Sequence, residues 1–183
     1  MAFDFSFGPS SFTVFTEGDV GLITRLNRPA ACFSAKNWAA HFQSDSVTMG
    51  VRIITRNLVP PWNRINIFTD STAQGEVVAT AFGGYAMARV EARCRVMDTS
   101  MRVLAEGGPS FFSGSSIQIP WFYSVGFRFA GVAFADAVIS ASIGTGPLIV
   151  EVRITSSVAA YSQAVAEANI DNACVTAIRV FSS

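Results

Sequence analysis

The sequence predicts an all-β fold, a sandwich or a barrel built from many short strands. Apolar and polar residues alternate with period two along much of the chain, as in "ARVEARCRV" at 88–96. Such alternation is typical of a half-buried strand. Turn signals separate the alternating segments at short intervals, as in "LVPPWN" at 58–63 and "GTGP" at 144–147.

The predicted strands follow from this alternation. In 88–96 the residues Val90, Cys94 and Val96 share one face, and the arginines lie on the other. In "ACVTAIRVF" the alternation places Cys174, together with Thr176, Ile178 and Val180, on one face. The strands expected, in chain order, are 12–15, 21–26, 47–55, 64–69, 76–82, 88–96, 101–105, 116–119, 126–134, 137–143, 148–155 and 173–181. Between them, "DSTAQG" at 70–75 and "EGGPS" at 106–110 are predicted turns.

One or two short helices are also expected. In "SAKNWAAHF" at 34–42, Ser34 is a possible N-cap, and Trp38 and Phe42 are spaced i and i+4. The segment 156–169 is rich in alanine, which favours helix. It could equally be a long loop with one helical turn.

The length of the chain and its low content of charged residues predict one domain with an unusual surface. The chain has 183 residues, enough for a single domain at 1–183 with a sizeable core, and residues 1–15 are expected to form an extended N-terminal segment. Half of the residues are hydrophobic and only 14% are charged, less than a soluble monomer normally carries. We therefore expect partners to cover much of the surface. Thirteen basic residues balance thirteen acidic ones, so no net field favours nucleic acid or an anionic membrane.

The cysteines are expected to be reduced. Cys32, Cys94 and Cys174 are three in number and widely spaced, which argues against a disulfide framework and against a zinc site. We expect buried thiols, folding in a reducing compartment, no signal peptide and no membrane span.

No catalytic, cofactor or metal site is predicted. His41 is the only histidine, and no nucleophile motif accompanies it. Glu91 and Glu151 could meet across a sheet as a carboxylate pair, or both could be solvated strand-face residues. Arg89, Arg93 and Arg95 form a basic stripe that could contact RNA phosphates. The same stripe could be an ordinary strand face paired with Glu91 and its neighbours.

Aromatic residues are the candidates for subunit contacts. The sixteen Phe, three Trp and three Tyr include Phe residues that alternate in a nearly uncharged N-terminal segment. That segment must pack under its own domain or on a neighbouring chain, and we expect the neighbour. The predicted interface residues are Phe3, Phe5, Phe7, Pro60, Pro61, Trp62, Trp121 and Tyr123. In "SIQIPWFYSVGFRF", Pro120 is expected to end one strand, with a turn before the next strand begins at "GFRF".

Three segments together resemble a known family. They are "AAHFQSDSVTMGVRIITRNLVPPWNRINIFTD", "SIQIPWFYS" and the closing "ACVTAIRVF". In their order they are similar to picornavirus-like capsid proteins, most of all to the small coat protein of plant secoviruses (the comovirus and fabavirus group). Trp121 stands where the family most often has tyrosine. The resemblance implies an eight-stranded jelly roll and a structural coat protein of a plant RNA virus.

The resemblance also implies partners and a location. They are copies of this chain and a larger coat protein in an icosahedral shell, within a virion assembled in the host cytoplasm. Genomic RNA would be enclosed without a basic arm, and no catalytic residues come with the family. Two alternatives stay open: a soluble lectin-like β-sandwich with aromatic platforms at Trp62, Trp121 and Tyr123, and a subunit of a bacterial fibre.

Overall fold

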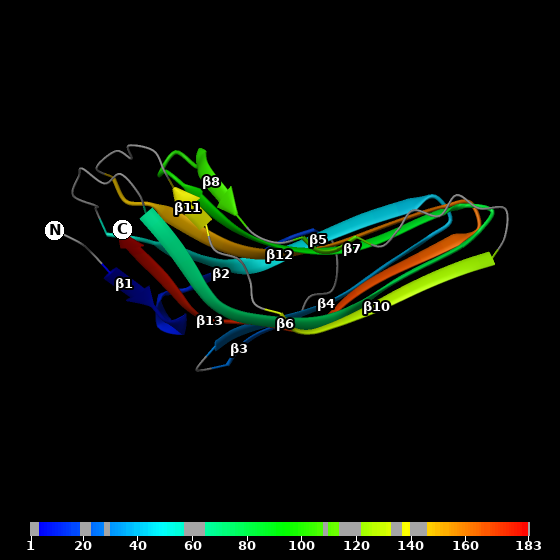
Figure 1. Cartoon of the computed structure of the whole chain (residues 1–183), viewed down its shortest axis with the longest axis horizontal. Helices are drawn as coiled ribbons and strands as arrows, with labels where there is room; N and C mark the ends of the chain where they lie inside the picture. The colour runs from blue at the N-terminus through cyan, green and yellow to red at the C-terminus, as the bar shows by residue number, and fades with distance from the viewer. Residues whose placement is uncertain are drawn as a thin grey trace.

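The fold consists of two antiparallel sheets packed face to face (Figure 1). The computed structural model describes residues 4–18, 23–27, 30–56, 65–107, 110–113, 122–132, 137–139 and 146–182. Its strands are β1 (Asp4–Phe7), β2 (Thr13–Glu17), β3 (Ile23–Asn27), β4 (Ala30–Ala40), β5 (Gln43–Ile54), β6 (Ile65–Phe82), β7 (Tyr85–Met97), β8 (Val103–Gly107), β9 (Ser110–Ser113), β10 (Phe122–Val132), β11 (Ala137–Ile139), β12 (Ile149–Tyr161) and β13 (Ala164–Ser182). A single 3-10 turn, η1 (Pro9–Ser11), joins β1 to β2.

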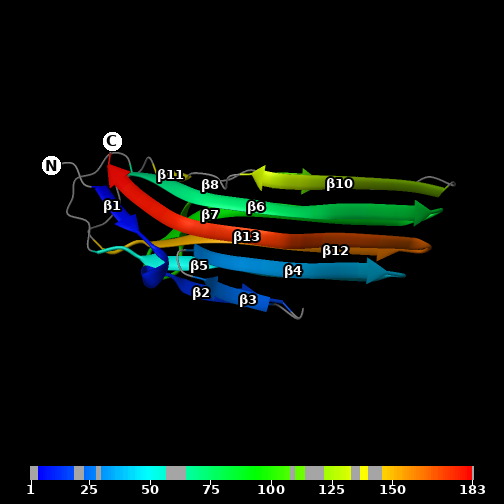
Figure 2. The same ribbon diagram turned by 90° about the horizontal axis from the view of Figure 1, so that it is seen from below.

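The strand order is that of a jelly roll. Sheet A has the order β10-β6-β13-β4-β3, with β1 beside β13 and β11 beside β6, and Figure 2 shows this sheet face on. Sheet B has the order β2-β5-β12-β7-β8, with β9 also paired to β7. The chain crosses between the sheets from β4 to β5, from β5 to β6, from β6 to β7 and from β12 to β13. Two four-stranded rows, β10-β6-β13-β4 and β5-β12-β7-β8, therefore interleave as in an eight-stranded double Greek key. The predicted fold class is confirmed.

The core changes character along the sandwich. Near the turns that join β4 to β5, β6 to β7 and β12 to β13, the buried apolar positions are mostly alanine, such as Ala39, Ala81, Ala86, Ala160 and Ala166. Toward the other end they are mostly Ile, Val and Met, such as Met49, Ile53, Ile67, Ile154 and Ile178. Because an alanine side chain is a single methyl group, the sheets can approach more closely at the alanine end. The sequence thus builds a sandwich that tapers toward its turns.

Two buried polar residues link the sheets within this core. The Asn37 amide of β4 donates to the Ser156 carbonyl of β12 at 3.1 Å. The Ser156 hydroxyl donates to the Ala168 carbonyl of β13 at 2.8 Å. Buried polar groups need such partners, and their geometry holds one sheet in register over the other.

The prediction of one or two short helices is wrong. Residues 34–40 lie in β4, with 41–42 in the turn that follows, and 156–169 form the end of β12, a two-residue turn and the start of β13. In both segments alternate residues face the core, for example Ala35, Asn37 and Ala39 in β4. The alanines fit between closely spaced sheets, so burial overrides their helical propensity.

Two segments that were predicted as turns, 70–75 and the residues before "GFRF", belong to strands in the structure. Strand β6 runs through 70–75 without a break, and so joins two strands that were expected separately. Ser71 and Ala73 face the core here, while the polar Asp70, Thr72 and Gln74 face outward. Strand β10 begins at Phe122, so residues 122–125 continue into "GFRF" rather than turning before it. The strand expected at 116–119 lies outside the described residues.

Bulges in β13 correct the predicted faces of the last strand. Its register with β6 shifts between Ile170 and Asn172 and again between Val175 and Ala177. Each extra residue reverses the side to which the following side chains point. Ile178 and Val180 are consequently buried, whereas Cys174 lies half-buried on the outer face.

The outward Cys174 forms a disulfide with Cys32, contrary to the prediction of reduced thiols. The two residues are direct cross-strand partners in β13 and β4, their Cα atoms are 4.1 Å apart, and 142 positions separate them in the sequence. The disulfide was not predicted because the chain has an odd number of cysteines. The third one, Cys94, is a buried thiol in the core. The cysteines therefore do not indicate a reducing compartment. Among the described residues no helix is long and apolar enough to cross a membrane.

Candidate functional site: the outer face of sheet B and the turn tip

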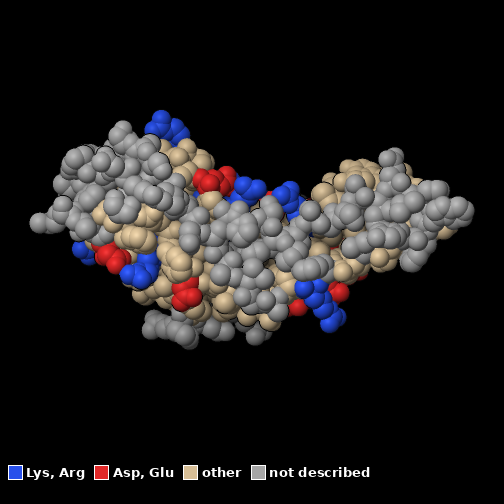
Figure 3. Space-filling view, in the orientation of Figure 1, with Lys and Arg blue, Asp and Glu red and all other residues tan. Residues whose placement is uncertain are grey.

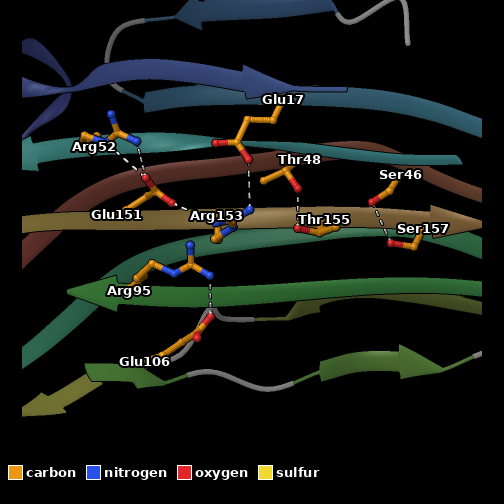
Figure 4. A network of polar contacts seen from close by, with 10 residues as sticks. All are labelled: Glu17, Ser46, Thr48, Arg52, Arg95, Glu106, Glu151, Arg153, Thr155 and Ser157. Atoms are coloured by element: carbon orange, nitrogen blue, oxygen red, sulfur yellow. Dashed lines mark hydrogen bonds and ion pairs between the residues drawn. The ribbon is translucent and has the colours of Figure 1, made fainter. Parts of the chain in front are cut away.

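The outer face of sheet B carries a connected group of charged side chains. Period-two alternation sends arginines and glutamates of β5, β7 and β12 outward while the residues between them fill the core. Figure 3 shows blue and red side chains on the floor of a hollow in this face. The ends of the molecule rise on either side of it. Figure 4 shows the contacts that hold these side chains together.

Glu151 of β12 is the centre of this network. Its side chain is only 3% exposed, and Arg52 Nη2 binds its Oε2 at 2.6 Å from the neighbouring strand β5. Arg153 Nη1 binds the other carboxylate oxygen at 3.3 Å. The guanidinium of Arg52 also stacks over the Phe15 ring at 5.1 Å. Arg153 reaches Glu17 of β2 at 3.3 Å, so the network attaches the edge strand β2 to the sheet.

The predicted basic stripe is an ion-paired strand face. Arg89 pairs with Glu91, and Arg93 lies 3.5 Å from the same carboxylate. Arg95 pairs with Glu106 of β8 at 3.3 Å. Glu91 and Glu151 do not face each other, since Glu91 is opposite Thr155 and Glu151 is opposite Arg95. The stripe is thus neutralised by carboxylates, as its ordinary interpretation predicts, and RNA contact through it stays a prediction.

Paired hydroxyl groups continue this face toward the turns. Thr48 and Thr155 are hydrogen-bonded at 2.8 Å, and Ser46 and Ser157 at 3.0 Å, each pair linking β5 to β12 (Figure 4). Hydroxyls, carboxylates and guanidinium groups on one surface can exchange hydrogen bonds with a polar ligand such as a sugar. Among the described residues no three His, Cys, Asp or Glu side chains are grouped as metal ligands would be.

The N-terminal phenylalanines lie against their own domain. Phe5 and Phe7 are in β1, which pairs with the end of β13, and both side chains are half-buried against the core. Their role at a subunit interface stays a prediction. Phe3, Pro60, Pro61, Trp62 and Trp121 lie outside the described residues. Tyr123 lies in β10, and its side chain is also outside the description.

A second surface, absent from the sequence-based candidates, lies at the tapered end. We call it the turn tip: His41 and Phe42 between β4 and β5, Phe82 and Tyr85 around the β6–β7 turn, and Tyr161 and Ser162 between β12 and β13. Figure 1 shows these three turns together, at the end of the molecule opposite the β1 strand. This surface was not predicted, because the helix expected at 34–42 placed Phe42 inside a helix rather than at a turn.

The turn tip joins aromatic rings from separate turns. The rings of Phe42 and Tyr161 meet edge to face with centroids 6.3 Å apart. Tyr161 then contacts Tyr85, with centroids 5.7 Å apart. His41 Nδ1 lies 3.2 Å from the Ser162 carbonyl oxygen, which adds a polar link between two of the turns.

Comparison with known proteins identifies no family. No family model and no curated protein matches the sequence. Among solved structures, the enzymatically active domain of tailspike protein 4 of bacteriophage CBA120 is similar at 14% identity and a TM-score of 0.29. That match covers 90% of this chain and 19% of the tailspike chain, so this chain spans about a fifth of its length.

Two further structures represent the two leading functional alternatives. TmCBM61 in complex with beta-1,4-galactotriose is 14% identical with a TM-score of 0.26, and the match covers 93% of this chain and 88% of that chain. The structure of infectious bursal disease virus Gx strain is 10% identical with a TM-score of 0.18, covering 96% of this chain and 42% of that chain. TM-scores this low leave the function to be argued from the chain itself.

Proposed function

We propose that the protein is a structural subunit that assembles, with copies of itself and a larger coat protein, into an icosahedral viral capsid around RNA. The observation that carries the proposal is that large apolar side chains are exposed on several sides of the sandwich. They are Trp38, Phe42, Ile54, Phe68, Phe82, Met101, Val103 and Tyr161. A binding module needs one such surface, whereas a shell subunit meets neighbours on several.

The positions of these side chains support contacts in different directions. Trp38 and Phe68 lie on the outer face of sheet A, and Ile54 lies at the end of β5 in sheet B. Met101 and Val103 lie at and after the β7–β8 turn. Contiguous exposed apolar surface usually marks an interface. The low charge and the resemblance to secovirus small coat proteins support the same proposal.

The kind of virus and the role of the subunit are proposed from the resemblance to secovirus small coat proteins. It makes the protein the small coat protein of a plant RNA virus, present in the virion and assembled in the host cytoplasm. Disulfides are rare in the cytosol, so this proposal requires Cys32–Cys174 to close after assembly. The proposed role is structural, with no catalytic step.

Electron microscopy of the purified full chain tests the proposal. The chain is produced alone and together with the protein encoded immediately upstream of it. Closed spherical particles in either preparation are expected. Filaments would support the bacterial fibre instead, and monomers in both preparations would overturn the capsid proposal.

A second candidate, a carbohydrate-binding module, is favoured by one observation. The hollow in the outer face of sheet B presents hydroxyl, carboxylate and guanidinium groups within a single surface (Figures 3 and 4). Polar groups that converge in a concave site are typical of small-molecule binding. A glycan array with the full chain tests this candidate, and Arg95→Ala should weaken any binding that uses the hollow. An array without binders would remove it.

A further inference from the structure

We infer that the outer face of sheet A carries a binding site for a neutral oligosaccharide, extending from the exposed indole of Trp38 to a cavity beside a bulge in β13. The inference goes beyond the proposed capsid function, because it adds a soluble ligand to a structural subunit. It also concerns a different surface from the hollow in sheet B. Four features of the described residues support it: a cavity, a row of polar groups, an exposed indole and the balance of charge.

The cavity lies on sheet A, where β10, β6 and β13 run side by side (Figure 2). Its volume of about 370 Å³ falls within the range of small-molecule sites. We call it the bulge cavity, and its lining consists of Gln74, Gly75, Glu76, Arg128, Phe129 and Asp171.

A bulge in β13 adds Asp171 to the lining of the bulge cavity. Ile170 pairs with Gly75 and Asn172 pairs with the next residue, Gln74, so Asp171 is the extra residue of the longer strand. Its side chain is exposed. Bulges next to functional sites commonly redirect a side chain in this way. The carboxylate of Asp171 therefore faces solvent beside the cavity, where a ligand can reach it.

A row of polar side chains leads from the bulge cavity across the sheet. The strand register aligns four outward-facing residues from β10, β6, β13 and β4. They are Arg128, Glu76, Asn169 and Lys36. Because neighbouring strands lie about 4.8 Å apart, the row is about 14 Å long. A surface of this length suits a chain of linked sugars rather than a single one.

Most of these polar groups keep their hydrogen-bonding capacity for a ligand. Arg128 Nε binds Glu76 Oε2 at 3.2 Å. Within the described parts of the chain, no hydrogen bond or ion pair holds the side chains of Lys36, Asn169 and Asp171. The ammonium group donates, the carboxylate accepts and the amide does both, so together they match the hydroxyl groups of a sugar.

Trp38 provides a flat apolar surface beside the β4 end of this row. The residue is 56% exposed, and it lies opposite Glu167 of β13 and two positions from Lys36. One face of a sugar ring presents C–H groups that pack on an indole, while the hydroxyl groups at its rim bond to nearby polar side chains. The centre of a subunit interface is instead depleted of charged residues. An indole between a lysine and a glutamate is therefore better suited to a sugar.

The balance of charge favours a neutral ligand. Lys36 and Arg128 contribute two positive charges, and Glu76, Glu167 and Asp171 contribute three negative ones. These carboxylates would repel RNA and sulfated or sialylated glycans. The described residues also contain no group of three His, Cys, Asp or Glu that would hold a metal ion. A neutral oligosaccharide can bond to groups of both signs without repulsion.

The test begins with a glycan array that carries neutral, sialylated and sulfated glycans, probed with the labelled full chain. The strongest neutral binder is then titrated calorimetrically into the wild type and its variants. Trp38→Ala removes the indole, Trp38→Phe keeps an aromatic ring, and Asp171→Ala alters the bulge cavity. Phe68→Ala is the matched control, because Phe68 is a 48% exposed aromatic residue on the same face of sheet A, toward the other end of β6. Thermal unfolding reports the folding of every variant.

We expect Trp38→Ala to weaken binding at least tenfold, as loss of an anchoring aromatic residue does. Trp38→Phe should retain part of the affinity, and Asp171→Ala should weaken binding without removing the indole. Phe68→Ala should bind like the wild type. Longer oligosaccharides should bind more tightly than the corresponding monosaccharide, because the row and the cavity extend the contact. If Trp38→Ala fails to fold, Trp38→Phe and Asp171→Ala decide.

Several results would overturn the inference. They are an array without neutral binders, binding restricted to sulfated or sialylated glycans, and binding that requires an added metal ion. Equal losses in Phe68→Ala and Trp38→Ala would also overturn it. A loss in Arg95→Ala with none in Trp38→Ala would move the glycan to the hollow in sheet B, against this inference.

The outcomes separate this inference from the capsid proposal. Monomers that bind a neutral glycan through Trp38 would contradict the capsid and support the sugar site. Closed particles that bind no glycan would support the capsid and contradict the sugar site. If Trp38→Ala prevents assembly of a chain that binds no glycan, Trp38 is a subunit contact and the inference is wrong.

Discussion

At the scale of single residues, Glu151 shows how an outward-facing position can be buried. The alternation of β12 points its side chain away from the core. Arg52 and Arg153 nevertheless cover it, so that only 3% of the side chain is exposed. A carboxylate so enclosed depends on its two cationic partners. The outer face of sheet B is therefore an ordered layer rather than a set of solvated side chains.

Glu151→Gln should lower the free energy of unfolding by about 2 kcal/mol. This is less than the ~3–5 kcal/mol for breaking a fully buried pair, because Arg52 and Arg153 reach solvent. Urea denaturation measures the change. The matched control is Glu76→Gln, whose partner Arg128 is 84% exposed, and which should cost less than about 1 kcal/mol. Equal effects of the two substitutions would contradict the enclosed network.

Gly75 of β6 occupies a position with no room for a side chain. A Cβ atom there would collide with the Asn169 main-chain oxygen and lie 2.7 Å from Cζ of Phe129. We expect Gly75→Ala to destabilise the protein by about 3 kcal/mol, as overpacking does. Gly126→Ala on the neighbouring strand β10 is the control, because its Cβ would lie 3.7 Å from the nearest atom. Similar melting temperatures of the two variants would rule out the close approach.

At the scale of elements, the turn between β7 and β8 depends on one carboxylate. Asp98 accepts hydrogen bonds from the backbone N–H groups of Ser100 and Arg102 at 2.9 and 3.0 Å. Its Oδ2 also accepts a bond from Arg102 Nε at 3.1 Å. The Arg102 N–H bond is the main cause that lowers the pKa of Asp98 below its ordinary value of 3.8.

Asp98→Asn should reduce stability in a pH-dependent way. A carboxylate whose pKa is lowered by folding stabilises the protein above its unfolded pKa, and this stabilisation disappears as the pH falls through the folded value. The melting temperature of the variant should therefore lie below that of the wild type at pH 7. The difference should shrink below about pH 3.8, the ordinary value. A difference that is constant from pH 7 to pH 2 would contradict the role of the charge.

The disulfide between β4 and β13 should contribute strongly to stability. Cross-links over long loops stabilise by about 2–5 kcal/mol, and this one spans 142 positions. Adding a reductant should lower the melting temperature of the wild type. The Cys32→Ser, Cys174→Ser double variant should melt at the lower temperature with or without the reductant. A melting temperature of the wild type that does not respond to the reductant would show that the bond does not form in solution.

The sequence was sufficient for the elements in which alternation is undisturbed. Residues 88–96 were predicted as a strand with Val90, Cys94 and Val96 inward, and all three are buried in β7. Alanine-rich 156–169 was misread, because alanine favours helix locally while the narrow space between the sheets selects it for its size. Pairing of Cys32 with Cys174 depends on the register of β4 and β13, which shifts between Ile170 and Ala173 of β13. No local pattern encodes that register.

The candidate site was less predictable than the fold. Pairing of Arg89 and Arg93 with Glu91 was one of the two interpretations that their common strand face allowed. The Arg95–Glu106 pair was not predicted, because it depends on the register of β7 and β8. The turn tip was not predicted either, since three turns separated by dozens of residues contribute to it. Their meeting is a property of the jelly-roll order rather than of any one segment.

At the scale of the whole molecule, the distribution of side-chain volume shapes the sandwich. Alanine at one end and Ile, Val and Met at the other make the separation of the sheets vary along the core. Ala88→Leu, at a fully buried position near the turns, should cost about 3 kcal/mol because the added atoms have no space. Val96→Leu, toward the wide end of the same strand, should cost about 1 kcal/mol. Unfolding in urea measures both, and equal costs would argue against a tapered core.

The Cys32–Cys174 bond also decides which part of the chain can bear a load. If the molecule is pulled by its two ends, the tension passes from the N-terminal arm through the disulfide to the C-terminal arm. Residues 33–173 lie within the closed loop and carry no tension while the bond is intact. Mechanical force would therefore peel β1, β2, β3 and the end of β13, and the rest of the sandwich would stay folded.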